Sequence, residues 1–208
     1  DVNHLAFANG FSDYAMGNYF AHADKLNWLT PAQLAWIEAD LAHTDKQTII
    51  FSHQSLADSV FGAKDAPRLQ EIIRAENKRC NWQKVIACMN GHNHTDGVRV
   101  VDGVYYISVN SASFFYMSSD ICIPRYSPEI TEQYPILRES APYKEPLYAF
   151  VTITQNEICI TGKDSAFEGP SPLECGHCGH AGGHPATPCI QDKRLPLRGK
   201  EESSCNQT

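Results

Sequence analysis

Three histidines follow the ends of two apolar segments in this chain. His92 and His94, one residue apart, come after the apolar run 85–89, and His53 comes after the apolar run 48–51. Imidazole nitrogens bind divalent metal ions at about 2 Å when the ring is held in one orientation. Residues that follow neighbouring strands of an α/β sheet meet at one edge of that sheet. The sequence therefore predicts a metal site that contains these three histidines.

Polar neighbours of the histidines are candidate contacts for a substrate or for the ligand rings. They are Gln54, Asn93 and Asp96. Side chains of these types are also common in surface turns, and a single His-x-His sequence is often no more than a turn. His53, at the end of a separate segment, favours the metal site over the turn. Gly91, which has no side chain, is expected to allow a close approach of another backbone.

Helix and strand signals place these motifs in an α/β domain. Thr30 is expected to cap a helix over residues 31–43, which has proline at its first position. A second amphipathic helix is predicted at 67–79, between buried strands at 48–51 and 84–89. This alternation of helices and strands predicts a parallel sheet in a layered α/β fold.

The second half of the chain is predicted to be rich in β-structure. Two hairpins are expected, one pairing 98–101 with 104–109 around an Asp-Gly turn, the other pairing 147–153 with 157–160. Residues 114–146 contain five prolines, which exclude a long helix or a central strand. This segment is therefore predicted to be a long ordered loop or an insertion.

The composition predicts one domain, residues 1–168, followed by an extended tail, residues 169–208, that is rich in Cys, His and Pro. One Cys-x-x-Cys pair with neighbouring histidines is compatible with a structural zinc ion. Without a matching second pair, disulfides or unpaired cysteines are favoured instead. The cysteines concerned are Cys175, Cys178, Cys189 and Cys205.

Charge and hydropathy narrow the classes of partner. The formal net charge is -7 and the chain has no basic cluster, so binding to a nucleic-acid backbone is not expected. No apolar run approaches the roughly 20 residues that span a bilayer. The chain begins at Asp1 without an initiating Met, which indicates a processed or truncated chain. The compartment stays open, an extracytoplasmic one included, and so does the oligomeric state.

The motifs around the histidines resemble those of the calcineurin-like metallophosphoesterases. In that family a strand ends in His, as in Ser52-His53-Gln54, and a later strand ends in Gly-His-x-His, as in Gly91-His92-Asn93-His94. Residues 29–37 also look like the helix opening that precedes the first of these motifs in bacterial members. The resemblance covers roughly residues 26–110.

The resemblance implies a layered metallophosphoesterase-like sandwich that is incomplete at its N-terminus. It also implies two divalent or trivalent metal ions, of Mn, Fe, Zn or Co, with His53 and His92 on one ion and His94 on the other. Hydroxide held between the ions would attack a phosphate ester. The family's carboxylate ligands and acid histidine would precede residue 1, and Asp1-Val2-Asn3 looks like the end of the strand that follows them. This chain alone is then expected to be inactive.

A second interpretation is a non-catalytic metal- or ligand-binding domain that retains the same fold. The bridging carboxylate separates the two interpretations, because a binuclear hydrolytic centre requires it. The sequence leaves the substrate and the identity of the metals open.

Overall fold

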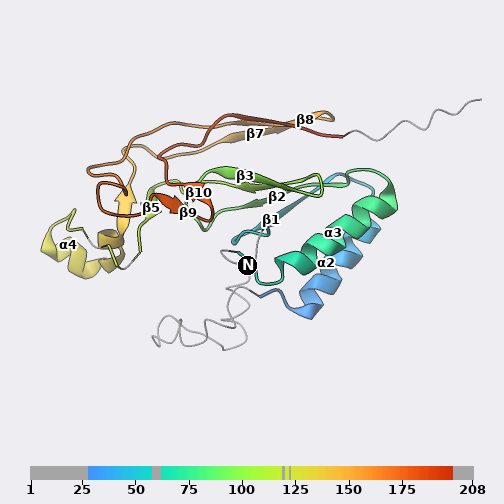
Figure 1. The fold of residues 1–208 in the computed structure, drawn as a ribbon, viewed down its shortest axis with the longest axis horizontal. Coiled ribbons are helices and arrows are strands. Elements are labelled where there is room, and N and C mark those ends of the chain that lie inside the picture. Colours follow the sequence, from blue (N-terminus) through green and yellow to red (C-terminus); the bar gives the residue numbers. More distant parts are fainter. Residues whose placement is uncertain (1–27, 58–61, 119, 122, 199–208) are drawn as a thin grey trace, which may run out of the picture.

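The computed structural model describes residues 28–57, 62–118, 120–121 and 123–198. These residues form a mixed α/β structure in three layers (Figure 1). Two helices cover one face of a four-stranded sheet, and a three-stranded sheet covers the other face. The predictions made for Asp1-Val2-Asn3 and Cys205 fall outside the described residues.

The two predicted helices are present, and local signals set their ends. Helix α2 (Pro31–His43) begins after Thr30, whose hydroxyl oxygen accepts a hydrogen bond of 3.1 Å from the backbone N–H of Gln33. Helix α3 (Ala66–Cys80) ends at an asparagine in the left-handed conformation, Asn81, whose φ is 55°. An asparagine in this conformation is a common way to stop a helix.

The main sheet brings together the strands that precede the histidines. Its strands, in spatial order, are β1 (Thr48–Ser52), β2 (Val85–Asn90), β4 (Val104–Ser108) and β3 (Gly97–Val101). The first three are parallel, and β3 is antiparallel to β4. Ser52 pairs with Asn90, and Asn90 pairs with Ser108, so the three parallel strands end at one edge. The predicted parallel sheet is confirmed.

The hairpin between β3 and β4 has the turn that its sequence predicts. Asp102 and Gly103 have φ values of 50° and 80°. Two consecutive residues with positive φ match the right-handed twist of the paired strands, which is why Asp-Gly is favoured there. The side chain of Asp102 also accepts a hydrogen bond of 2.7 Å from Arg74 of α3. This contact ties the hairpin to the helical layer.

The second sheet includes part of the predicted tail. It consists of β11 (Lys193–Pro196), β8 (Glu157–Thr161) and β7 (Phe150–Ile153), all antiparallel. The prediction of an extended tail is therefore wrong for residues 169–198. These residues pack against the domain, and Ile190 and Leu197 are part of its apolar core. A short hairpin, β9 (His180–Ala181) with β10 (His184–Pro185), precedes β11.

The proline-rich segment contains short elements rather than one loop. Strands β5 (Phe114–Tyr116) and β6 (Ser140–Pro142) pair with each other. Helix α4 (Pro128–Gln133) and a 3₁₀ turn, η2 (Pro135–Glu139), lie between them in the chain. Prolines stand at the start of both helical turns, where no N–H donor is needed. Helix α4 projects from the end of the domain at which β5 lies (Figure 1).

Two apolar clusters hold the three layers together. One lies between the two sheets and includes Ile86, Met89, Ile107, Ile158 and Ile160. The other lies between the helices and the main sheet and includes Leu41, Leu69, Ile73, Val85 and Val104. Strand β2 contributes to both clusters, and all six of its residues are buried. The strand that leads to His92 is thus fixed on both of its faces.

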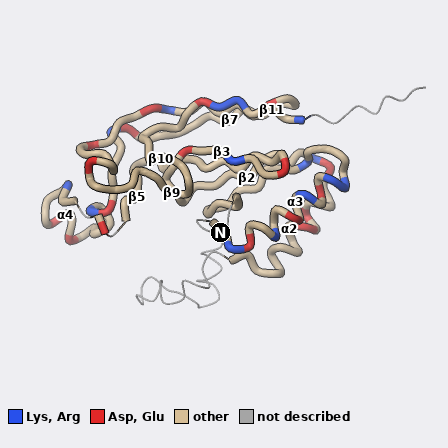
Figure 2. Tube along the Cα trace, in the orientation of Figure 1, with Lys and Arg blue, Asp and Glu red and all other residues tan. Residues whose placement is uncertain are grey.

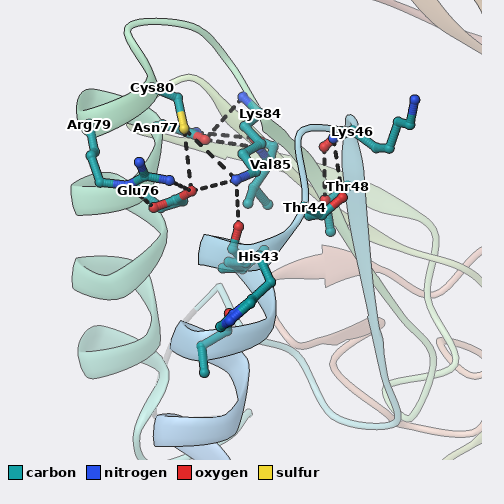
Figure 3. A network of polar contacts seen from close by, with 12 residues as sticks. His43, Thr44, Lys46, Thr48, Glu76, Asn77, Arg79, Cys80, Lys84 and Val85 are labelled. Carbon is teal, nitrogen blue, oxygen red and sulfur yellow. Dashed lines mark hydrogen bonds and ion pairs between the residues drawn. The ribbon is translucent and has the colours of Figure 1, made fainter.

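A buried polar network fixes the other end of β2 (Figure 3). The side chain of Lys84 is 1% exposed, and its ammonium group donates to the carbonyl oxygen of Leu41 and to the carboxylate of Glu76. Arg79 donates two further hydrogen bonds, of 2.8 and 2.7 Å, to the same carboxylate. Because Leu41 belongs to α2 and Glu76 to α3, Lys84 links both helices to the start of β2.

The four-stranded sheet and the three-stranded sheet each have one edge strand whose side chains are unusually exposed. In β1, Phe51 is 74% exposed, and all four residues of β7 are exposed, with Phe150 at 70%. Among the described residues, no strand pairs with the outer side of β1 or of β7.

Charged side chains are distributed over the described part of the molecule. Figure 2 shows Lys and Arg interspersed with Asp and Glu along the trace. Several form exposed ion pairs, such as Arg68 with Glu71 and Arg194 with Glu157. No helix within the described ranges has the length and apolar character needed to span a membrane.

Candidate metal site

The ends of β1 and β2 bring His53 and His92 together. Their strands are paired from Thr48 to Ser52, so the residues that follow leave the sheet at adjacent positions. The Nδ1 atom of His92 lies 3.0 Å from the Nε2 atom of His53, and the ring centroids are 4.8 Å apart. One of these two nitrogens carries a proton that the other accepts.

The separation of these nitrogens fits two ligands of one metal ion. Two imidazole nitrogens that bind one ion at about 2.1 Å lie roughly 3.0–3.4 Å from each other. The Nδ1 atom of His92 and the Nε2 atom of His53 already have a separation in this range. Binding of a metal ion by both nitrogens would replace the proton that they share. The geometry of this pair therefore fits a metal ion.

His94 presents a nitrogen that lacks a partner. Its ring packs edge to face on Phe114 of β5, with centroids 4.8 Å apart. Its Nδ1 atom is buried and has no hydrogen-bond partner within the described part of the chain. A buried polar atom without a partner destabilises a fold unless a water, an ion or a ligand satisfies it. This orphaned nitrogen also fits a metal ligand.

The surroundings keep all three imidazoles in the neutral form that binds metals. Burial lowers the pKa of His92 to about 4, and the charges of His53 and His94 lower it further. Burial also lowers the pKa of His53 and of His94, although a backbone hydrogen bond at Phe114 opposes the effect at His94. A neutral ring needs to lose no proton before a metal ion binds.

Both histidines of the Gly-His-x-His sequence have unusual backbone angles. The φ angle is 65° at His92 and 52° at His94. The left-handed region is disfavoured for residues with a side chain, and such residues gather at functional sites where the surroundings enforce the conformation. These angles turn the chain sharply after β2. The loop 91–96, here called the histidine loop, therefore depends on neighbouring segments for its shape.

The other predicted site residues have different surroundings. Gln54 is 1% exposed and lines a mostly apolar pocket of about 230 Å³ between α2 and β1, which His53 also lines. Asn93 packs against Gly182 of the β9–β10 turn. Asp96 is 8% exposed and forms an ion pair with Lys193. The structure therefore directs Asn93 and Asp96 towards the C-terminal segment.

The close backbone approach expected at Gly91 occurs elsewhere. A Cβ atom at Gly91 would meet no atom within 4 Å. At Gly182 it would lie 2.3 Å from the side chain of Asn93, and at Gly97 it would lie 2.1 Å from the ring of His184. Gly97 and Gly182 thus leave room for side chains between the β9–β10 hairpin and the region of the histidine loop, and the close approach of another backbone occurs at Gly162, where a Cβ atom would lie 1.8 Å from the carbonyl oxygen of Ile190.

Sequence reasoning missed two contacts of the site. Phe114 supports the ring of His94, and Lys193 holds Asp96 at the end of the histidine loop. Neither contact has a local signal, because Lys193 lies 97 residues from Asp96 along the chain. The Gly182-Gly183 pair does indicate a turn, and a hairpin could have been predicted there from the sequence.

The described residues alone do not complete a metal site. Among them, no group of three or more His, Cys, Asp and Glu side chains is arranged to hold an ion. The thiols of Cys175, Cys178 and Cys189 are free, and the Sγ atom of Cys175 accepts a hydrogen bond of 3.4 Å from Arg125. The described part of the Cys/His-rich segment thus contains neither a disulfide nor a cluster shaped for zinc.

Comparisons of the chain with known proteins give no family assignment. No protein-family model matches it, and no curated protein matches it. The function is therefore inferred from the geometry around the histidines and from the motifs that contain them.

Proposed function

We propose that this chain is part of a metal-dependent phosphoesterase of the calcineurin-like type, with His53, His92 and His94 as metal ligands. The observation that carries the proposal is the 3.0 Å separation of the His53 and His92 ring nitrogens at the ends of adjacent parallel strands. The partnerless Nδ1 atom of His94 supports it. The layered arrangement of two sheets and two helices agrees with a metallophosphoesterase-like sandwich.

Each residue has a distinct role in this proposal. His53 and His92 hold one ion, and His94 contributes to a second. Bound metal ions would supply hydroxide near neutral pH and stabilise negative charge on a phosphoryl group. Phe114 fixes the plane of the His94 ring, and the apolar pocket beside His53 limits the access of water to one side. Carboxylate ligands and a general acid would come from residues that the resemblance places before residue 1.

One observation favours a second candidate, a non-catalytic metal-binding domain with the same fold. The described residues at the site provide imidazoles, and Asp96, the carboxylate nearest in sequence, is held by Lys193. A binuclear hydrolytic centre requires a bridging carboxylate. This second candidate predicts metal binding without hydrolysis.

Metal binding tests both candidates together. Titration calorimetry of the chain with Mn²⁺ or Zn²⁺ should show binding that weakens at least tenfold in His92→Ala, because one ligand is lost. His43→Ala is the matched control, since His43 ends α2 before the start of β1, whereas His53 follows the end of β1, and the His43 ring contacts the carbonyl oxygen of Ala39. Equal affinity in His92→Ala and the unaltered chain would refute the metal site.

Hydrolysis separates the two candidates. The intact parent chain, loaded with metal, is assayed with p-nitrophenyl phosphate and with bis-p-nitrophenyl phosphate. Turnover that disappears in His92→Ala and persists in His43→Ala supports the phosphoesterase. Metal binding with no turnover of either ester supports the non-catalytic domain.

A further inference from the structure

We propose that the C-terminal segment 179–193 positions the histidine loop, with Asp96 and Lys193 as its principal positioning residues. The inference rests on the proposed function, because it concerns how His92 and His94 are held as metal ligands. The segment itself supplies no ligand to the site. Its effect passes through the backbone of the histidine loop.

The histidine loop requires external support. His92 and His94 both have left-handed φ angles, which a free loop would leave for more favourable conformations. Strand β2 fixes the loop at its first residue through pairing with β1 and β4. Strand β3, which begins at Gly97, fixes its far end through pairing with β4. The residues between these two strands need contacts of their own, because a loop held only at its ends can still rotate its side chains away from a metal ion.

The ion pair of Asp96 supplies an anchor from outside the main sheet. Both carboxylate oxygens of Asp96 accept from the Nζ atom of Lys193, at 2.7 and 2.6 Å. One of them also accepts a hydrogen bond of 3.0 Å from the backbone N–H of Gln191. The side chains of Asp96 and Lys193 are 4% and 12% exposed, so solvent screens this pair little. The pair joins the end of the histidine loop to the start of β11.

The β9–β10 hairpin supports the middle of the loop. The hydroxyl of Thr95 donates to the carbonyl oxygen of Ala181 at 3.3 Å, and Thr95 is fully buried. Gly182, in the turn, leaves room for the side chain of Asn93. Arg99 of β3 donates a hydrogen bond of 2.9 Å to the carbonyl oxygen of Gly182, which holds the turn against the main sheet. Asn93, Thr95 and Asp96 therefore each contact the C-terminal segment.

Lys193→Met is the direct test of this positioning role. Co²⁺ is the probe, because its visible absorption spectrum reports ligand geometry as well as binding. We expect about tenfold weaker Co²⁺ binding and an altered spectrum in Lys193→Met, with unchanged far-ultraviolet circular dichroism. Lys193→Arg, which keeps the charge and the ion pair, should restore most of the affinity. A purely structural role of Lys193 would lower thermal stability and leave the spectrum of the bound Co²⁺ unchanged.

Arg194→Met is the matched control. Arg194 is the next residue of β11, its side chain is 80% exposed, and it pairs with Glu157 far from the histidines along the chain. Co²⁺ affinity equal to that of the unaltered chain is expected here.

A second variant covers the case in which Lys193→Met does not fold. Thr95→Val keeps the volume of the side chain and removes the hydrogen bond to Ala181. Weaker Co²⁺ binding in Thr95→Val supports the positioning role, and unchanged binding in a folded Lys193→Met or in Thr95→Val overturns it. Failure of the unaltered chain to bind Co²⁺ would instead remove the proposed metal site itself, and the positioning role with it.

Discussion

Replacement of Lys84 by Met tests how the start of β2 is held. The substitution keeps most of the side-chain volume and removes the ammonium group. The carbonyl oxygen of Leu41, at the end of α2, loses its donor, and Glu76 loses one of its charged partners (Figure 3). Loss of one partner from a buried ion pair costs roughly 3–5 kcal/mol when the remaining charge has no compensation.

The negative charge of Glu76 keeps one partner, so the expected loss of stability is smaller than this. Arg79 still donates two hydrogen bonds to its carboxylate after the substitution. The remaining loss is that of a buried carbonyl oxygen without a donor, worth about 1–3 kcal/mol, together with a weaker charge interaction. We therefore expect a loss of about 2–3 kcal/mol in the free energy of unfolding. For a chain of this size the melting temperature should fall by roughly 5–10 °C.

Urea unfolding followed by circular dichroism measures this loss. Lys163→Met is the matched control, because Lys163 also forms an ion pair, with Glu145 at 2.6 Å, but the Glu145 side chain is 64% exposed. An exposed pair contributes at most about 1 kcal/mol. If Lys84→Met costs no more than Lys163→Met, the reasoning about the buried network is wrong.

Two further predictions concern titratable groups in the core. The hydrogen bonds from Arg79, and to a smaller extent the one from Lys84, lower the pKa of Glu76 from 4.5 to about 2. The contribution of Glu76 to stability is therefore complete above about pH 4.5 and is lost as the pH falls towards 2. Glu76→Gln should therefore flatten the dependence of the urea midpoint on pH in this window, and an unchanged slope would contradict the assignment. Burial raises the pKa of the Cys88 thiol to about 12, so iodoacetamide at pH 8 should alkylate exposed Cys178 well before Cys88. Mass spectrometry of the peptides checks the order, and early modification of Cys88 would show that β2 opens readily.

Local chemistry explains which elements the sequence could predict. The Thr30 cap and the prolines at the helix starts act within one turn of helix, so α2 and α3 were open to prediction. The Asp102-Gly103 turn likewise depends on two residues. The convergence of His53 and His92 followed from the parallel pairing of two apolar strands.

Long-range packing explains what the sequence could not predict. Strand β11 reads Lys193-Arg194-Leu195-Pro196, which has little apolar character and contains a proline, so it lacks the usual signal of a strand. It becomes a strand because β8 offers an edge to pair with. The contacts of Asp96 with Lys193 and of His94 with Phe114 arise only after the layers have packed.

In the part of the chain that the structure describes, β1 and β7 have no strand paired with their outer edges, and each edge is a directional surface. An edge strand offers a regular row of N–H and C=O groups, to which another extended chain can add. Phe51 and Phe150, on these two edges, are exposed and carry no charge that would repel such a chain. A strand added at such an edge would lie about 4.8 Å from the edge strand. An apolar patch without an open edge would not fix the position of its partner in this way. A strand that paired with either edge would extend that sheet, so the backbone hydrogen-bond pattern of the edge would set the direction and register of whatever joins it.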